Sequence, residues 1–441
     1  MSPMGATAKL GAQAVPRVAA RAAVDLDTLI RSVLFVAVFL AAWISFHPFQ
    51  SLSTPPQAVV GGGDIANQLG FSSLFLAFAA FSYWHEPRRL TLLLRPVLVA
   101  VIAWCVLSVV ASWEPALAAR RLAFALVVMS ISAMALLLPK NLRHFSDLLA
   151  AATLIVLTAC YLGVLLAPQL AIHQATDFLE PEHAGNWRGV FPHKNDAGAT
   201  MVLFVFIGFY VARMRSLALG AAIVVLSAVF LGFTQSKTAI GVLPLALILS
   251  AIIRRSRSPA FGVTLVIVIL LVFELCSIGT VMFEPIRQLM TAIVPDATFT
   301  GRTEIWQLAA QAVMHRPITG YGYLTFWGTP EVVYGFTDTV TWANAATDAH
   351  NAYLNLAVTI GIPGMLLVVV WVVVLPVVDF CRRAPDAHTE PLQMLFLRVC
   401  LYAVYASCFE SSILQQVGEV WFFYMTSAFG LRYLSRARAT P

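Results

Sequence analysis

The chain has 441 residues, of which 59% are hydrophobic and only 11% are charged. This composition excludes an ordinary soluble domain, in which about a quarter of the residues are charged. The net charge of +6 does not indicate nucleic-acid binding, because the lysine and arginine residues gather between long apolar runs, where they face anionic lipid.

Apolar windows that end at charged residues, proline or glycine predict about twelve transmembrane helices, since a helix needs about 20 apolar residues to cross a bilayer. The windows are 29–47, 67–84, 95–113, 122–138, 146–169, 197–212, 217–234, 238–253, 260–282, 351–380, 391–409 and 417–433. The sequence therefore predicts an all-α polytopic membrane protein. Its predicted organisation is a tail over 1–28, nine helices over 29–282, a large outer loop over 283–350, three helices over 351–433 and a tail over 434–441.

Lysine and arginine residues predict the orientation, because they are retained preferentially in cytoplasmic loops. With both termini in the cytoplasm, 20 of the 28 lie on the inner side. The eight that remain outside are Arg120, Arg121, Arg188, Lys194, Lys237, Arg287, Arg302 and Arg316. A positive residue kept outside against this rule is a candidate for function, so we expect a site on the outer face.

The run WRGVFPHKND, from Trp187 to Asp196, places guanidinium, imidazole and ammonium groups within seven residues of one another. It closes an outer loop expected over about 170–196, and it contains Arg188 and Lys194. Arginine binds phosphate oxygens through two parallel hydrogen bonds and lysine acts as a point charge. The run therefore indicates an anion-binding site, to which Lys237 in the short outer turn 235–238 adds a further charge.

A helix is predicted inside the large outer loop, where GRTEIW opens a helical pattern at Gly301 and Pro317 ends it. One face of this helix is polar and the other apolar. The polar residues are Glu304, Gln307, Gln311 and His315, and the apolar residues are Ile305, Leu308, Ala309, Ala312 and Val313. We expect the helix to lie along the membrane interface and to cover the end of the bundle.

His350 immediately precedes the tenth predicted span. The positive end of a helix dipole disfavours an imidazolium, so we expect a neutral ring that can accept a proton. Asp348, two residues earlier, is expected to hold one ring nitrogen and to leave the other free.

These residues also have structural interpretations. An arginine or lysine of the 187–196 run can pair with Glu180 or Glu182, and the turn lysine can cap the preceding helix. A histidine at a membrane interface is more often a structural hydrogen-bonding residue than a base, and this is the expectation for His193. A functional role is favoured because several of these residues lie on the same predicted side of the membrane. They are Arg188, Lys194, Lys237, Arg302 and His350.

The sequence predicts neither a metal nor a cofactor. Asp25-Leu-Asp27 is the only Asp-X-Asp sequence, and it lies on the predicted cytoplasmic tail. The six cysteines show no disulfide framework and no metal-binding spacing.

The order of several motifs resembles the O-antigen ligase and polymerase superfamily of bacterial inner-membrane glycosyltransferases. The motifs are RGVFPHKN, QSKT, GRTEIW, GYGY, HNAYLNL and GIPG, spread over residues 188–364. The form RGVFPHKN is most similar to the exopolysaccharide polymerase branch. The resemblance covers roughly 30–435 and implies a GT-C-like fold in the inner membrane with a periplasmic site.

The resemblance further implies metal-independent, inverting transfer of a glycan from undecaprenyl diphosphate to a hydroxyl of an acceptor sugar. Exopolysaccharide or O-antigen polymerisation is the favoured reaction, and ligation to a lipid A core is the alternative. The acceptor would be a lipid-linked repeat or that core, and a chain-length regulator is a further expected partner. The expected diphosphate ligands are Arg188, Lys194, Lys237 and Arg302, the expected base or orienting group is His350, and the supporting residues are Asp348, His193, Tyr321 and Tyr353.

One departure from the family pattern concerns Lys237, because this turn often carries arginine in the family. A lysine there acts as a point charge and does not form the two parallel hydrogen bonds to phosphate that an arginine forms. The competing class is a flippase for lipid-linked oligosaccharides. That class favours ionisable residues in the middle of spans and an internal repeat. The predicted spans have almost no ionisable residues away from their ends, and the sequence shows no internal repeat.

Overall fold

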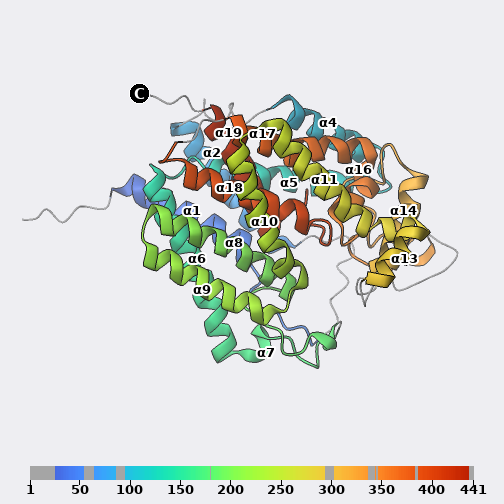
Figure 1. The fold of residues 1–441 in the computed structure, drawn as a ribbon, viewed down its shortest axis with the longest axis horizontal. Helices are drawn as coiled ribbons and strands as arrows, with labels where there is room; N and C mark the ends of the chain where they lie inside the picture. Colours follow the sequence, from blue (N-terminus) through green and yellow to red (C-terminus); the bar gives the residue numbers. More distant parts are fainter. Residues whose placement is uncertain are drawn as a thin grey trace, which may run out of the picture.

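The computed structural model describes residues 25–53, 64–85, 95–178, 180–293, 302–335, 343, 346–382 and 386–436. The regular structure in these residues is helical, with one isolated bridge between Ile172 and Trp187. Most of the two predicted tails, together with Arg88, Arg89 and Gly301, lies outside the described residues. Figure 1 shows the helices packed side by side, with the 302–315 helix at one end of the bundle.

A helix occupies each of the twelve predicted windows. The bounds are α1 Leu26–Ile44, α2 Ile65–His85, α4 Pro96–Val110, α5 Pro115–Ala135, α6 Leu142–Leu166, α8 Lys194–Met214, α9 Leu217–Thr234, α10 Lys237–Ser256, α11 Pro259–Cys276, α16 Ala352–Val369 continued by η3 Val370–Val374 and α17 Leu375–Arg382, α18 Glu390–Ala406 and α19 Glu419–Arg436. Within the described residues, eight helices are long and apolar enough to cross a membrane. The all-α membrane fold is confirmed, while the count of twelve spans stays a prediction.

The shorter elements lie in the loops. They are α7 Pro168–Ala171, η1 Pro181–His183, α12 Gly279–Met282, α13 Glu284–Ile293, α14 Arg302–His315 and α15 Pro330–Gly335. The helix predicted after Gly301 is present as α14, and Ile305, Leu308 and Ala312 on its apolar side are buried. Its position at the membrane interface stays a prediction.

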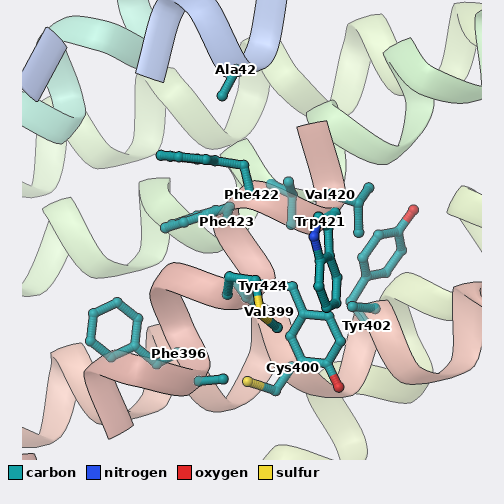
Figure 2. Close-up of a cluster of buried hydrophobic side chains, with 14 of the residues drawn as sticks. Ala42, Phe396, Val399, Cys400, Tyr402, Val420, Trp421, Phe422, Phe423 and Tyr424 are labelled. Carbon is teal, nitrogen blue, oxygen red and sulfur yellow. The ribbon is translucent and has the colours of Figure 1, made fainter. Parts of the chain in front are cut away.

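Helices α18 and α19 are buried along most of their length. Figure 2 shows Phe396 and Cys400 of α18 beside the run Val420–Tyr424 of α19, with Ala42 of α1 nearby. Trp43 packs edge-on against Phe423 at 5.9 Å, and Phe39 against Phe422 at 5.4 Å. Close packing of this kind holds membrane helices together, because lipid tails are as apolar as the side chains and supply little hydrophobic driving force.

A break in α16 fixes the loop that follows α14. Gly361 has a φ of +74°, which other residues rarely adopt. The carbonyls of Val358 and Thr359 accept the backbone N–H groups of Tyr321 and Gly322, both at 3.0 Å. The GYGY segment is therefore bonded to α16 just before the GIPG motif, and α14 is held against α16.

Candidate functional site

Four helices begin at one place on the bundle. They are α8 at Lys194, α10 at Lys237, α14 at Arg302 and α16 at Ala352. The Ser236 hydroxyl, just before α10, donates to Asn195 Oδ1 at 3.1 Å. Asn195 Nδ2, in the first turn of α8, donates to Glu410 Oε1 at 3.2 Å. The starts of α8 and α10 are therefore linked to each other and to the Glu410 carboxylate.

Glu410 is the centre of this group. It follows α18, and its Oε1 accepts a hydrogen bond from Arg302 Nη2 at 3.0 Å. Arg302 Nη1 donates to the carbonyl of Phe409. Burial raises the pKa of the Glu410 carboxyl, but the charges of Arg302 and His350 lower it below its ordinary value overall. Glu410 is thus an ionised partner for Arg302 and for the ring of His350.

His350 lies on the other side of the same carboxylate. Its Nδ1 is 3.7 Å from Glu410 Oε2 and 3.9 Å from Asp348 Oδ1. Both are ion-pair distances, so this buried nitrogen has no hydrogen-bond partner among the described residues. The backbone N–H of His350 donates to Asp348 Oδ1 at 2.7 Å, and Asn351 caps α16 by accepting from Leu354 N at 2.9 Å.

The sequence predicts a neutral ring for His350, but the structure shifts the pKa of this ring in the opposite direction. Burial lowers the pKa of the ring, but the Glu410 carboxylate and the charge of Asp348 outweigh burial and Arg302, so the pKa lies above 6.5. The helix dipole alone cannot predict this result, because Glu410 is 60 residues away in sequence. Asp348 also differs from its expected role, since it binds the His350 backbone more closely than the ring.

Arg188 is buried with 1% of its surface exposed. Its guanidinium donates to three backbone carbonyls: Gln50 at 2.5 Å, Phe191 at 3.2 Å and Pro192 at 3.4 Å. The Nε group is buried without a partner among the described residues. Arg188 therefore ties its own loop to the segment that follows α1, and none of its hydrogen bonds is to Glu410.

The two lysines stand at neighbouring helix starts. Lys194 is half-buried, its backbone N–H donates to His173 Nε2 at 3.2 Å, and Lys237 is exposed. A Cβ added at Gly198 of α8 would meet Ser236 Cβ at 2.6 Å, so the first turns of α8 and α10 are in close contact. Lys194 and Lys237 therefore lie at the starts of two helices that are in contact.

The remaining predicted residues have structural contacts. His193 caps α8, with Nδ1 accepting from Asn195 N at 3.1 Å. Tyr321 is buried, donates to the Ala312 carbonyl at 3.2 Å and packs against Trp113. Tyr353 is buried and donates to the Val404 carbonyl at 2.8 Å. These contacts position α8, α14 and α16.

Sequence reasoning missed Glu410 and Asn195. Glu410 directly follows the predicted window 391–409 and belongs to no motif. Asn195 lies inside the run RGVFPHKN, but its neutral amide gives no signal for anion binding beside the charged residues of that run. Among the described residues, the group with metal-ligand spacing is Glu180, His183 and His193, and it does not include these two residues.

The fold and site together define a polytopic helical membrane protein with a charged site at the starts of four helices. Residues 222–369 match the family model described as O-Antigen ligase. The exopolysaccharide production protein ExoQ of Rhizobium meliloti (strain 1021) is 26% identical over 222 residues, which is 48% of this chain and 50% of ExoQ. The chain thus spans about half the length of the curated relative that it matches.

The chain is thus similar to the O-antigen ligase family over residues 222–369 and to an exopolysaccharide production protein over about half of its length. The matched segment contains Lys237, Arg302 and His350. It does not reach Arg188, Lys194 or Glu410, so their roles rest on the structure.

Proposed function

We propose that the protein transfers a glycan from undecaprenyl diphosphate to a hydroxyl of an acceptor sugar and thereby lengthens an exopolysaccharide or O-antigen. The observation that carries this proposal is the meeting of four helix starts at Lys194, Lys237, Arg302 and His350. Helix N-termini and cationic side chains are the groups that bind phosphate. In the proposed substrate, the diphosphate leaving group is the part that these groups would bind.

Arg302 is the principal diphosphate ligand in this proposal. Its bonds to Glu410 and the Phe409 carbonyl use two of its five N–H donors and hold the guanidinium in place. The other donors can bind phosphate oxygens, while Lys194 and Lys237 act as point charges. Negative charge grows on the diphosphate as it leaves, so fixed cations stabilise the transition state more than the ground state. The proposal requires no metal ion for this step.

The reaction exchanges one bond for another at the anomeric carbon of the donor glycan. The acceptor hydroxyl oxygen forms a bond to this carbon, the bond to the diphosphate oxygen breaks, and the configuration inverts. The hydroxyl proton passes to the neutral ring of His350, and the lipid diphosphate departs with the bonding electron pair. Glu410 then stabilises the imidazolium, as a carboxylate does for a catalytic histidine.

Arg188 has a supporting role in this proposal. Its three carbonyl bonds hold the 188–192 segment, which leads directly to Lys194 and Asn195. The diphosphate role expected from the motif would require the guanidinium to leave these carbonyls. We therefore assign Arg188 to positioning and Arg302 to substrate binding.

The site faces the periplasm in this proposal, with both termini in the cytoplasm. The supporting observation is that α10 runs from Lys237 at the site to Arg254 and Arg255 at its far end, which suits positive residues in the cytoplasm. The lipid-linked donor and a lipid-linked acceptor would both approach from the bilayer, and a chain-length regulator is a further proposed partner.

Ligation to a lipid A core is the second candidate, favoured by the description of the matching family model. Deletion of the gene distinguishes the two. A polymerase mutant loses high-molecular-weight secreted polysaccharide and keeps normal capping of the lipopolysaccharide core. Loss of capping, with polymer accumulating on the lipid carrier, would identify a ligase. Unchanged polysaccharide and unchanged capping would reject both.

A further inference from the structure

A cluster of three histidines and a glutamate lies in the loop before α8. The rings of His173, His183 and His193 are 5.2–5.8 Å apart, centre to centre. Glu180 Oε2 lies 2.7 Å from His193 Nε2 and 3.8 Å from His183 Nε2. These residues come from η1, the turn before it and the cap of α8, so the loop folds back to bring them together. The transfer proposed above uses none of them as a reacting group.

We infer that Glu180, His183 and His193 bind a divalent transition-metal ion of the Zn²⁺ class. Their three ligand atoms lie within 4.8 Å of one another. Two imidazoles and one carboxylate form a ligand set that suits Zn²⁺, and the half-exposed position leaves a fourth place for water. In a tetrahedral site with bonds of about 2.0–2.1 Å, neighbouring ligand atoms are about 3.3 Å apart. The two distances from Glu180 Oε2, 2.7 Å to His193 Nε2 and 3.8 Å to His183 Nε2, lie on either side of this value.

Glu180 and His193 are in direct contact. His193 Nε2 and Glu180 Oε2 are 2.7 Å apart, which is an ion-pair distance. The pKa of Glu180 is lowered to about 2, chiefly by His193, so the carboxylate is available as an anionic ligand.

His173 completes the wall of the site but is not a ligand. Its Nδ1 lies 2.9 Å from Asp177 Oδ2, and its Nε2 accepts the Lys194 N–H. Both ring nitrogens are therefore engaged. Zinc-class metals accept neutral imidazole only through a free nitrogen lone pair, so three protein ligands remain.

Metal binding competes with the cap of α8. His193 Nδ1 now accepts the Asn195 N–H, which places the ring proton on Nε2. A metal on Nε2 displaces this proton to Nδ1, and the ring then cannot accept from Asn195. The lost cap lowers the binding constant about fivefold. Metal binding thus removes the cap at the start of α8, where Lys194 and Asn195 lie.

The test measures Zn²⁺ binding to the metal-stripped full chain in lipid nanodiscs by calorimetry, with Co²⁺ absorption as a report of tetrahedral geometry. We expect one Zn²⁺ per chain and a rise in thermal stability on binding. His183→Ala and Glu180→Gln should each weaken binding by about a hundredfold or more. His193→Asn is the sharpest variant, because asparagine can still cap the helix but cannot supply Nε2.

The matched control is His388→Ala, which removes a histidine from the loop before α18 and should leave binding unchanged. Equal Zn²⁺ affinity in the parent chain and in His193→Asn would overturn the inference. So would an equal loss in the His388 variant, since binding would then be spread over surface histidines. The readout is independent of glycan transfer, and a failure of the proposed function leaves it intact.

Discussion

Glu410→Gln is the substitution that tests the site most sharply. It preserves the size of the side chain and removes the charge that Arg302 and His350 share. Glutamine can still accept one hydrogen bond from Arg302 or Asn195, but its amide group then faces the other partners. The change therefore separates the charge of Glu410 from its bulk.

The expected effects follow from three contacts at 3.0, 3.2 and 3.7 Å. Hydrogen bonds to charged groups contribute about 1.5–3 kcal/mol when buried. Arg302 and Glu410 are 16% and 25% exposed, so we expect a stability loss of only about 1–2 kcal/mol. A catalytic group displaced by about 1 Å can lose a hundredfold in rate. We expect kcat to fall by about this factor, while KM for the donor stays equal or falls, because Arg302 loses its competing anion.

The pH dependence of kcat/KM gives a second readout, and the direction of its shift in the variant can be predicted. The raised pKa of His350 means that its neutral form, and hence kcat/KM, is lost as the pH falls through a value above 6.5. Glu410→Gln removes the carboxylate that contributes most to raising this pKa. Burial and Arg302, which lower it, remain, and only the charge of Asp348 still raises it. The acid limb of the variant should move to lower pH.

The assay uses purified protein in lipid with a diphosphate-linked oligosaccharide, and it follows glycan length and released lipid diphosphate. Glu331→Gln, an exposed change of the same chemistry on α15, is the matched control. An acid limb at the same pH in the variant and in the control, together with equal kcat, would refute the role of Glu410.

Three further predictions concern other parts of the protein. Arg302→Ala should abolish polymer at normal protein level, and Arg302→Lys should restore it only in part, because a point charge cannot reproduce a planar fork; polymer of normal length in the alanine variant would remove Arg302 from the site. Arg188→Ala should lower stability by about 2 kcal/mol or more, since buried carbonyls lose their donor, and an unchanged melting temperature would contradict its positioning role. A cysteine at Glu331 should react with an impermeant thiol reagent from outside the cytoplasmic membrane while one at Ser256 should not, and the reverse pattern would invert the proposed topology.

The helices could be predicted from the sequence because each window is long, apolar and bounded by charges. Each predicted window contains a helix, although α2 and α4 have shorter apolar parts than expected. The amphipathic pattern after Gly301 also located α14, since its apolar side must be buried. Local patterns of this kind depend on neighbouring residues alone.

The site was less predictable because its contacts join distant parts of the chain. Arg188 fits an anion-binding motif, yet its acceptors are carbonyls of its own loop and of Gln50. Glu410 has no local signal, because a single acid after a helix is common. The protonation of His350 depends on Glu410, so its pKa could not be inferred from the start of α16.

The most direct test of the proposed function is the stoichiometry of transfer in the reconstituted protein. With a diphosphate-linked oligosaccharide as both donor and acceptor, we expect one lipid diphosphate to be released for each new glycosidic bond, and the anomeric configuration at that bond to be inverted. Movement of the intact donor across the bilayer, with neither a new bond nor free lipid diphosphate under any acceptor condition, would contradict the proposal and identify a transporter.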